Sequence, residues 1–99
     1  MSNPMGSVEI GEEHMYAVLT ANTVVALEQV IRDALSADIA FVLALVQGDQ
    51  ISSTVISRGI QIKFGYGLAG YDAAGVHELV TKMNAEVREH GELRLGIPV

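Results

Sequence analysis

The residues with the most distinctive spacing are the glycines of the segment Gly65-Tyr66-Gly67-Leu68-Ala69-Gly70, which matches the pattern G-x-G-x-x-G. This segment lies between an expected strand and an expected helix. Glycines at this spacing let a backbone approach a phosphate group and direct it at the N-terminus of the following helix. Gly65, Gly67 and Gly70 are therefore candidate ligand-binding residues, and a small-ligand or nucleotide/phosphate-binding module is one hypothesis for the chain.

Three neighbouring features favour a structural role for the same glycines. The strand before them alternates apolar and polar residues, whereas a central parallel strand is usually apolar throughout. Asp72 stands at the expected start of the helix, where its charge would repel a phosphate. The chain that follows the helix is too short to complete a dinucleotide-binding fold. A tight glycine-rich connection is the alternative interpretation.

Other residue types that catalyse reactions or bind metals form no recognisable pattern. Ser52, Ser53 and Thr54 lie on an expected strand, without the G-x-S-x-G sequence that surrounds many serine nucleophiles. Glu86 and His90 are four residues apart on an expected helix and could chelate a metal, but a histidine at this end of a helix also complements its dipole. We therefore expect no catalytic residue, no metal site and no cofactor, and we favour a non-enzymatic protein.

The net charge of the chain is −6, and no Lys or Arg precedes Arg32. The six basic residues are scattered, so the sequence offers no basic patch to nucleic acid or to an anionic membrane. An acidic inhibitor of a macromolecular partner is a third hypothesis, although ordinary solubility also explains a charge of this size. Cysteine is absent, which excludes disulfides and thiol chemistry. No segment has the pattern of a secretion signal or a membrane span, so we expect a cytoplasmic protein.

Hydrophobic periodicity predicts an α+β fold with the element order β-α-β-β-β-α-β. We expect a small single-layer sheet of four to five mostly antiparallel strands packed by two helices. The expected strands cover 14–20, 39–47, 51–57, 60–64 and 93–99. The first expected helix covers 23–35, with Asn22 or Thr23 as its N-cap. The second covers 73–90, with Asp72 as its N-cap and Gly91 as its C-cap. Val8 and Ile10 could add a short strand to an N-terminal hairpin. Residues 1–7 are expected to form a flexible tail, and 8–99 a single domain.

The segment 39–46 is apolar on every face and fits two structures. The preceding helix could continue through it, because Ile39, Val42 and Val46 stay on the same helical stripe. A strand buried on both faces is the alternative. Gly48-Asp49 favours the strand, since a two-residue turn between apolar runs is typical of a β-hairpin.

The apolar content is high for so short a chain. Hydrophobic residues make up 49% and charged residues 18%, against about 25% charged in a typical soluble domain. Two helices could cover one face of a sheet, so the other face of 39–46 would need a partner, and closed homo-oligomers are the common solution. We therefore favour a small, non-enzymatic homo-oligomer that acts through protein–protein contacts as a structural, assembly or regulatory subunit.

The C-terminal strand is the expected contact between copies. Its apolar side chains alternate with other residues, and Pro98 restricts it to a sheet edge or a terminal arm. Such a strand could close the protein's own sheet, or it could add to the sheet of another copy. The expected interface residues are Leu93, Leu95, Ile97 and Val99.

Overall fold

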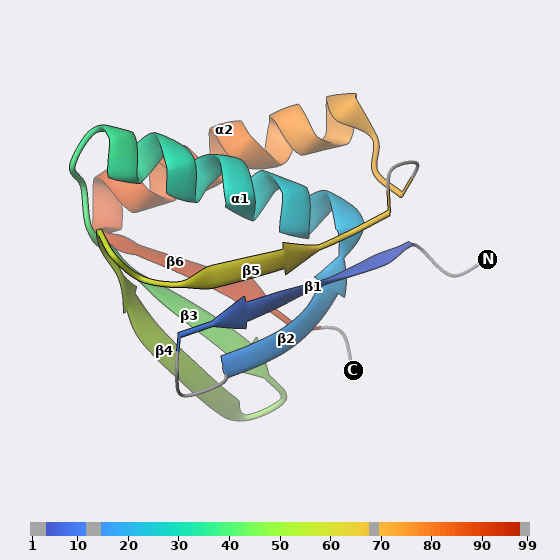
Figure 1. The fold of residues 1–99 in the computed structure, drawn as a ribbon, viewed down its shortest axis with the longest axis horizontal. Coiled ribbons are helices and arrows are strands. Elements are labelled where there is room, and N and C mark those ends of the chain that lie inside the picture. Colours follow the sequence, from blue (N-terminus) through green and yellow to red (C-terminus); the bar gives the residue numbers. More distant parts are fainter. Residues whose placement is uncertain (1–3, 12–14, 68–69, 98–99) are drawn as a thin grey trace.

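The computed structural model describes residues 4–11, 15–67 and 70–97, and within them the chain forms two helices and six strands (Figure 1). The elements are β1 (Met5–Ile10), β2 (Met15–Thr20), α1 (Ala21–Ser36), β3 (Phe41–Gln47), β4 (Gln50–Ile56), β5 (Ile62–Gly65), α2 (Ala73–His90) and β6 (Glu92–Gly96). The expected α+β class with two helices is confirmed. β1 begins at Met5, so the last residues of the expected flexible tail belong to a strand.

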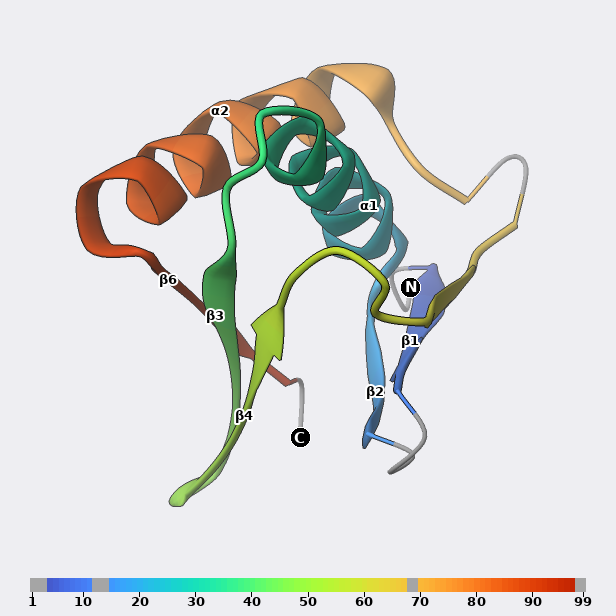
Figure 2. The same ribbon diagram turned by 60° about the vertical axis from the view of Figure 1, so that its left-hand side comes forward.

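The strands form two three-stranded sheets, with the orders β2-β1-β5 and β4-β3-β6. β1 pairs antiparallel with both of its neighbours, β3 pairs antiparallel with β4, and β6 lies parallel to β3. The expectation of one single-layer sheet is therefore wrong, because the strands form two sheets. The second view shows the two sheets as separate layers that diverge below the helices (Figure 2).

The link between β4 and β5 explains why the sheet is divided. Gly59 in this link has a φ of 86°, a left-handed conformation that turns the chain away from β4. The Gly11 amide then donates a 2.7 Å hydrogen bond to the Gln61 carbonyl, which joins the link to the end of β1. β5 consequently pairs with β1, its neighbour in space, and not with β4, its neighbour in sequence.

The hairpin of β3 and β4 confirms the strand interpretation of 39–46. Gln47 lies opposite Gln50, so the turn contains only Gly48 and Asp49. Gly48 has a φ of 62°, as the first central position of a type II′ turn requires. Phe41, Leu43 and Leu45 alternate along β3, are buried and belong to the hydrophobic core that also contains residues of α1.

The helices begin and end at residues with recognisable capping chemistry. In α2, the Asp72 carboxylate accepts a hydrogen bond from the Gly75 amide, and Gly91 closes the helix at a φ of 64°, as expected. In α1 the N-cap is Thr20, not Asn22 or Thr23, because the helix starts directly at the end of β2. The Thr20 hydroxyl lies 2.8 Å from the Thr23 hydroxyl and accepts from the Thr23 amide.

α1 is the central element of the core. Its buried residues are Ala21, Val24, Ala26, Leu27, Val30, Ile31 and Ala34. The helix packs against the strands of the β2-β1-β5 sheet on one side and against α2 on another. α2 in turn packs against β6. One hydrophobic cluster thus joins both sheets through α1.

Candidate functional site

Two of the three glycines predicted to bind a ligand line a surface depression. The depression has a volume of about 390 Å³ and lies on the outer face of the β2-β1-β5 sheet, the face opposite the core. Its lining consists of Met5, Gly6, Ser7, Tyr16, Val18, Gly65, Tyr66 and Gly67. Gly70 does not line it, although the Gly70 amide donates a 3.0 Å hydrogen bond to the Gly67 carbonyl.

Of the three glycines of this segment, Gly65 has the least space for a side chain. Each of Gly65, Gly67 and Gly70 has a φ outside the left-handed region. A Cβ atom on Gly65 would lie 2.8 Å from the Ser7 hydroxyl oxygen, which is too close, whereas a Cβ atom on Gly67 would meet no atom within 4 Å. Gly65 is therefore the position at which a side chain would disturb the floor of the depression.

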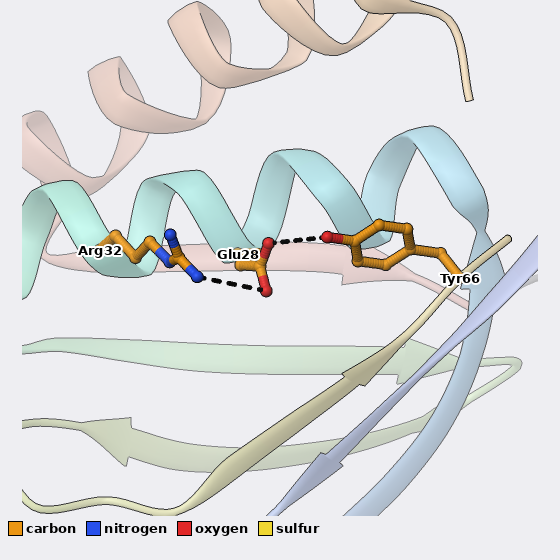
Figure 3. A network of polar contacts seen from close by, with 3 residues as sticks. All are labelled: Glu28, Arg32 and Tyr66. Carbon is orange, nitrogen blue, oxygen red and sulfur yellow. Dashed lines mark hydrogen bonds and ion pairs between the residues drawn. The ribbon is translucent and has the colours of Figure 1, made fainter. Parts of the chain in front are cut away.

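Tyr66 is one of the residues that line the depression, and its ring is held beside α1 by two contacts. Its hydroxyl donates a 3.0 Å hydrogen bond to Glu28 Oε1, and its ring meets Tyr71 edge to face at a centroid distance of 5.6 Å. Glu28 also forms an ion pair with Arg32, one helical turn later, at 3.9 Å (Figure 3). The hydrogen bond to Glu28 and the negative charge of this carboxylate raise the pKa of Tyr66 above its ordinary 10.0.

The N-terminus of α2 is already bonded within the chain. The Asp72 carboxylate accepts from the Gly75 amide at 3.0 Å, and the Asp72 amide donates to Asn22 Oδ1 at 2.8 Å. This acidic cap occupies the position that the motif would offer to a phosphate. Among the described residues that line the depression there is also no Lys, Arg or His. The arrangement is better suited to a neutral ligand than to an anion.

The four sheet edges differ in their protection. Edge strands in monomeric proteins are commonly protected from pairing by charged residues, proline or bulges. β5 carries Lys63 and β6 carries Glu92 and Arg94, but β2 and β4 contain neither a charged residue nor a proline. The sheets thus each have one charged and one uncharged edge.

β4 is the more accessible of the two uncharged edges. Gln50, Ile51, Ser52, Ser53 and Val55 are all exposed, and the side chains of Ile51 and Val55 are each 57% exposed. One edge of β4 pairs with β3, and within the described parts of the chain no strand pairs with the other. The sequence predicted a strand for this segment but did not identify its free edge. The absence of any charge between Gln50 and Ile56 was the signal that could have identified an open edge.

The predicted interface residues on the C-terminal strand lie largely inside the chain itself. Leu93 is 1% and Leu95 is 9% exposed, and both belong to the hydrophobic core. Ile97 is half-buried, and its amide donates a 2.7 Å hydrogen bond to the Val46 carbonyl. Val99 lies outside the described residues. β6 therefore closes its own sheet, which was one of the two arrangements open from the sequence.

The described residues assemble neither a metal site nor a buried polar centre. Glu86 and His90 line a shallow depression together with Glu92 and Arg94, but no group of three or more potential metal ligands occurs among the residues that the structure describes. Within the same residues, every buried side chain is apolar. Of the helices described, none has the length and apolar character that crossing a membrane would require.

Comparison of the chain with protein-family models, with curated proteins and with solved structures found no match in any of the three.

Proposed function

We propose that the chain is a small, non-enzymatic, cytoplasmic protein that assembles with copies of itself and acts through protein–protein contacts, as a structural, assembly or regulatory subunit. The observation that carries the proposal is the open edge of β4. This strand is uncharged, exposed and unpaired along one side in the described chain. An edge of this kind presents backbone donors and acceptors that another strand can pair with.

Exposed apolar side chains support the same proposal. The large hydrophobic residues that are exposed include Ile51 and Val55 on β4 and Tyr16 and Val18 on β2. These are the two edge strands that lack charge. Because partner strands bury side chains as well as backbone groups, apolar residues on an uncharged edge favour association over a monomeric state.

Sedimentation equilibrium over a wide concentration range tests this proposal. The expected result is a mass that rises with concentration to at least twice the 10.6 kDa of the chain. The backbone contacts are insensitive to salt, so the association should persist at high ionic strength. A monomer at every concentration up to about 0.5 mM would overturn the proposal, because the interaction would then be too weak for a stable subunit.

A second candidate function is small-ligand binding at the depression beside Tyr66. The lining combines two tyrosines, Tyr16 and Tyr66, and the apolar Met5 and Val18 with small residues and, within the described chain, contains no charged side chain, which suits a neutral ligand. Thermal unfolding in the presence of neutral aromatic compounds and of phosphate compounds separates the two ligand classes. Stabilisation by the neutral class that Gly65→Ala abolishes would support this function. Absence of stabilisation by either class would count against it.

A further inference from the structure

The hairpin geometry determines which backbone groups of β4 point to its open edge. Gln47 and Gln50 flank a two-residue turn, so they form a hydrogen-bonded pair, and such pairs alternate along an antiparallel ladder. Gln50, Ser52, Thr54 and Ile56 therefore direct their amide and carbonyl groups at β3. Ile51, Ser53 and Val55 direct theirs outward.

We propose that β4 pairs with β4 of a second copy, antiparallel and about a two-fold axis at Ser53. This inference rests on the proposed self-association and adds its location and register. Ser53 is the central residue of the Gln50–Ile56 strand. A two-fold axis at this residue therefore overlaps the whole strand with its partner, and it sets the outward backbone groups of both copies opposite each other. A six-stranded sheet, β6-β3-β4 followed by the same strands in reverse order, results.

The side chains of β4 are self-complementary in this register. On the outer face, Ile51 lies opposite Val55 of the second copy, so the two most exposed apolar residues of the strand cover each other. On the inner face, Ser52 lies opposite Thr54 of the second copy, and hydroxyl pairs of this kind form cross-strand hydrogen bonds. A shift of the axis to Ser52 or Thr54 shortens the overlap and loses the contact between Ile51 and Val55.

The other edges fit a second copy less well. On β6, an axis at the middle residue would place Arg94 against Arg94 of the second copy, and like charges in opposite positions are destabilising. On β2, Ala17 and Leu19 are already buried in the core, and Thr20 caps α1 directly at the end of the strand. A partner on β2 would thus gain fewer exposed side chains than a partner on β4.

Charge variants at Ser53 test the axis. Ser53→Lys alone and Ser53→Glu alone place like charges opposite each other, so each should weaken the dimer by about tenfold or more at low salt. An equimolar mixture of the two variants should restore a dimer that contains one copy of each. Ser36→Lys, an exposed change at the end of α1, is the matched control and should leave the dimer unchanged. Circular dichroism confirms that each variant remains folded.

Cysteine variants test the register independently, because the chain contains no cysteine of its own. Opposite residues of a hydrogen-bonded pair have Cα atoms about 5.5 Å apart, a separation that permits a disulfide. Ser53→Cys should therefore form an inter-chain disulfide under mild oxidation. Gln50→Cys should not, since its two copies would lie about 20 Å apart along the paired strands.

The outcomes separate the two proposals. A monomeric wild-type protein overturns the self-association itself. A wild-type oligomer that tolerates Ser53→Lys, and in which Ser53→Cys forms no disulfide, overturns the β4 register and leaves self-association in place. In that case disruption by Tyr16→Lys would indicate pairing through β2.

Discussion

The hydroxyl of Tyr66 donates a 3.0 Å hydrogen bond to Glu28, which joins the segment after β5 to the middle of α1 across 38 positions of the sequence. Tyr66 is exposed, whereas the Glu28 side chain is only 22% exposed and also pairs with Arg32 (Figure 3). Tyr66 also belongs to the residues that line the depression, together with two of the predicted glycines.

The alkaline titration of Tyr66 should report this hydrogen bond. Its pKa is raised because the protonated hydroxyl donates to Glu28 and because the phenolate would be repelled by this carboxylate. The folded protein thus holds this proton more tightly than the unfolded chain does. The resulting contribution to stability is fully present below the unfolded pKa, near 10.0, and is lost as the pH rises through the higher folded value.

The difference between the ultraviolet absorbance titrations of wild type and Tyr66→Phe isolates Tyr66 from Tyr16 and Tyr71. The midpoint of the difference curve is expected above 10.0, and Glu28→Gln should move it back toward this value. A wild-type midpoint at or below 10.0 would contradict the contact. Arg32→Gln removes a positive charge that lowers the pKa of Tyr66, so it should raise the midpoint further, in the direction opposite to Glu28→Gln.

Truncation of Leu27 should destabilise the fold strongly. Its side chain is fully buried on α1 at the centre of the cluster that joins both sheets. Leu27→Ala should lower the free energy of unfolding by about 2–5 kcal/mol, measured by urea denaturation. Leu35→Ala makes the same chemical change at a half-buried position of the same helix, and its effect should be clearly smaller. Equal losses at both positions would be inconsistent with a core centred on Leu27.

Alanine at Gly6 should be costly, whereas alanine at Gly67 should be tolerated. A Cβ atom on Gly6 would lie 2.7 Å from the Gly65 carbonyl oxygen and 3.0 Å from Val24 Cγ2. β1 would have to separate from β5 or α1, so Gly6→Ala should cost about 1–3 kcal/mol. Gly67→Ala introduces its Cβ into open space and should change the unfolding free energy by less than about 0.5 kcal/mol. Thermal unfolding of the pair provides the measurement, and a destabilised Gly67→Ala would show that this glycine has another role.

Alanine at Gly91 should reduce stability through backbone strain alone. Gly91 ends α2 at a φ of 64°, where a Cβ atom clashes with the backbone but meets no atom of another residue within 4 Å. Gly91→Ala should therefore cost about 1–2 kcal/mol in chemical denaturation. Gly96→Ala is the matched control, because Gly96 has equally open surroundings and no left-handed φ. The same loss in both variants would exclude strain as the cause.

Features with local physical causes were predictable from the sequence. The bounds of α2 follow from the N-cap Asp72 and the C-cap Gly91, and both caps appear in the structure as expected. The turn at Gly48-Asp49 was sufficient to identify β3 and β4. In each case, residues adjacent in sequence determine the backbone conformation.

The choice of strand partners was not predictable in the same way. Whether β5 pairs with β4 or β1 depends on Gly59 and on the bond between Gly11 and Gln61, which connects positions far apart in sequence. The candidate site has the same limitation. The motif identified Gly65 and Gly67, but Tyr16 belongs to the same depression only because β2, β1 and β5 lie side by side.

The division into two sheets has a mechanical consequence. In the described residues no ladder of backbone hydrogen bonds connects the β2-β1-β5 sheet to the β4-β3-β6 sheet, so α1 and the side chains around it determine the angle between them. Side-chain packing yields more readily than a hydrogen-bonded ladder when its contents change volume. The angle between the sheets therefore depends on side-chain packing, and we expect volume-changing substitutions on α1 to alter this angle while the strands within each sheet keep their register.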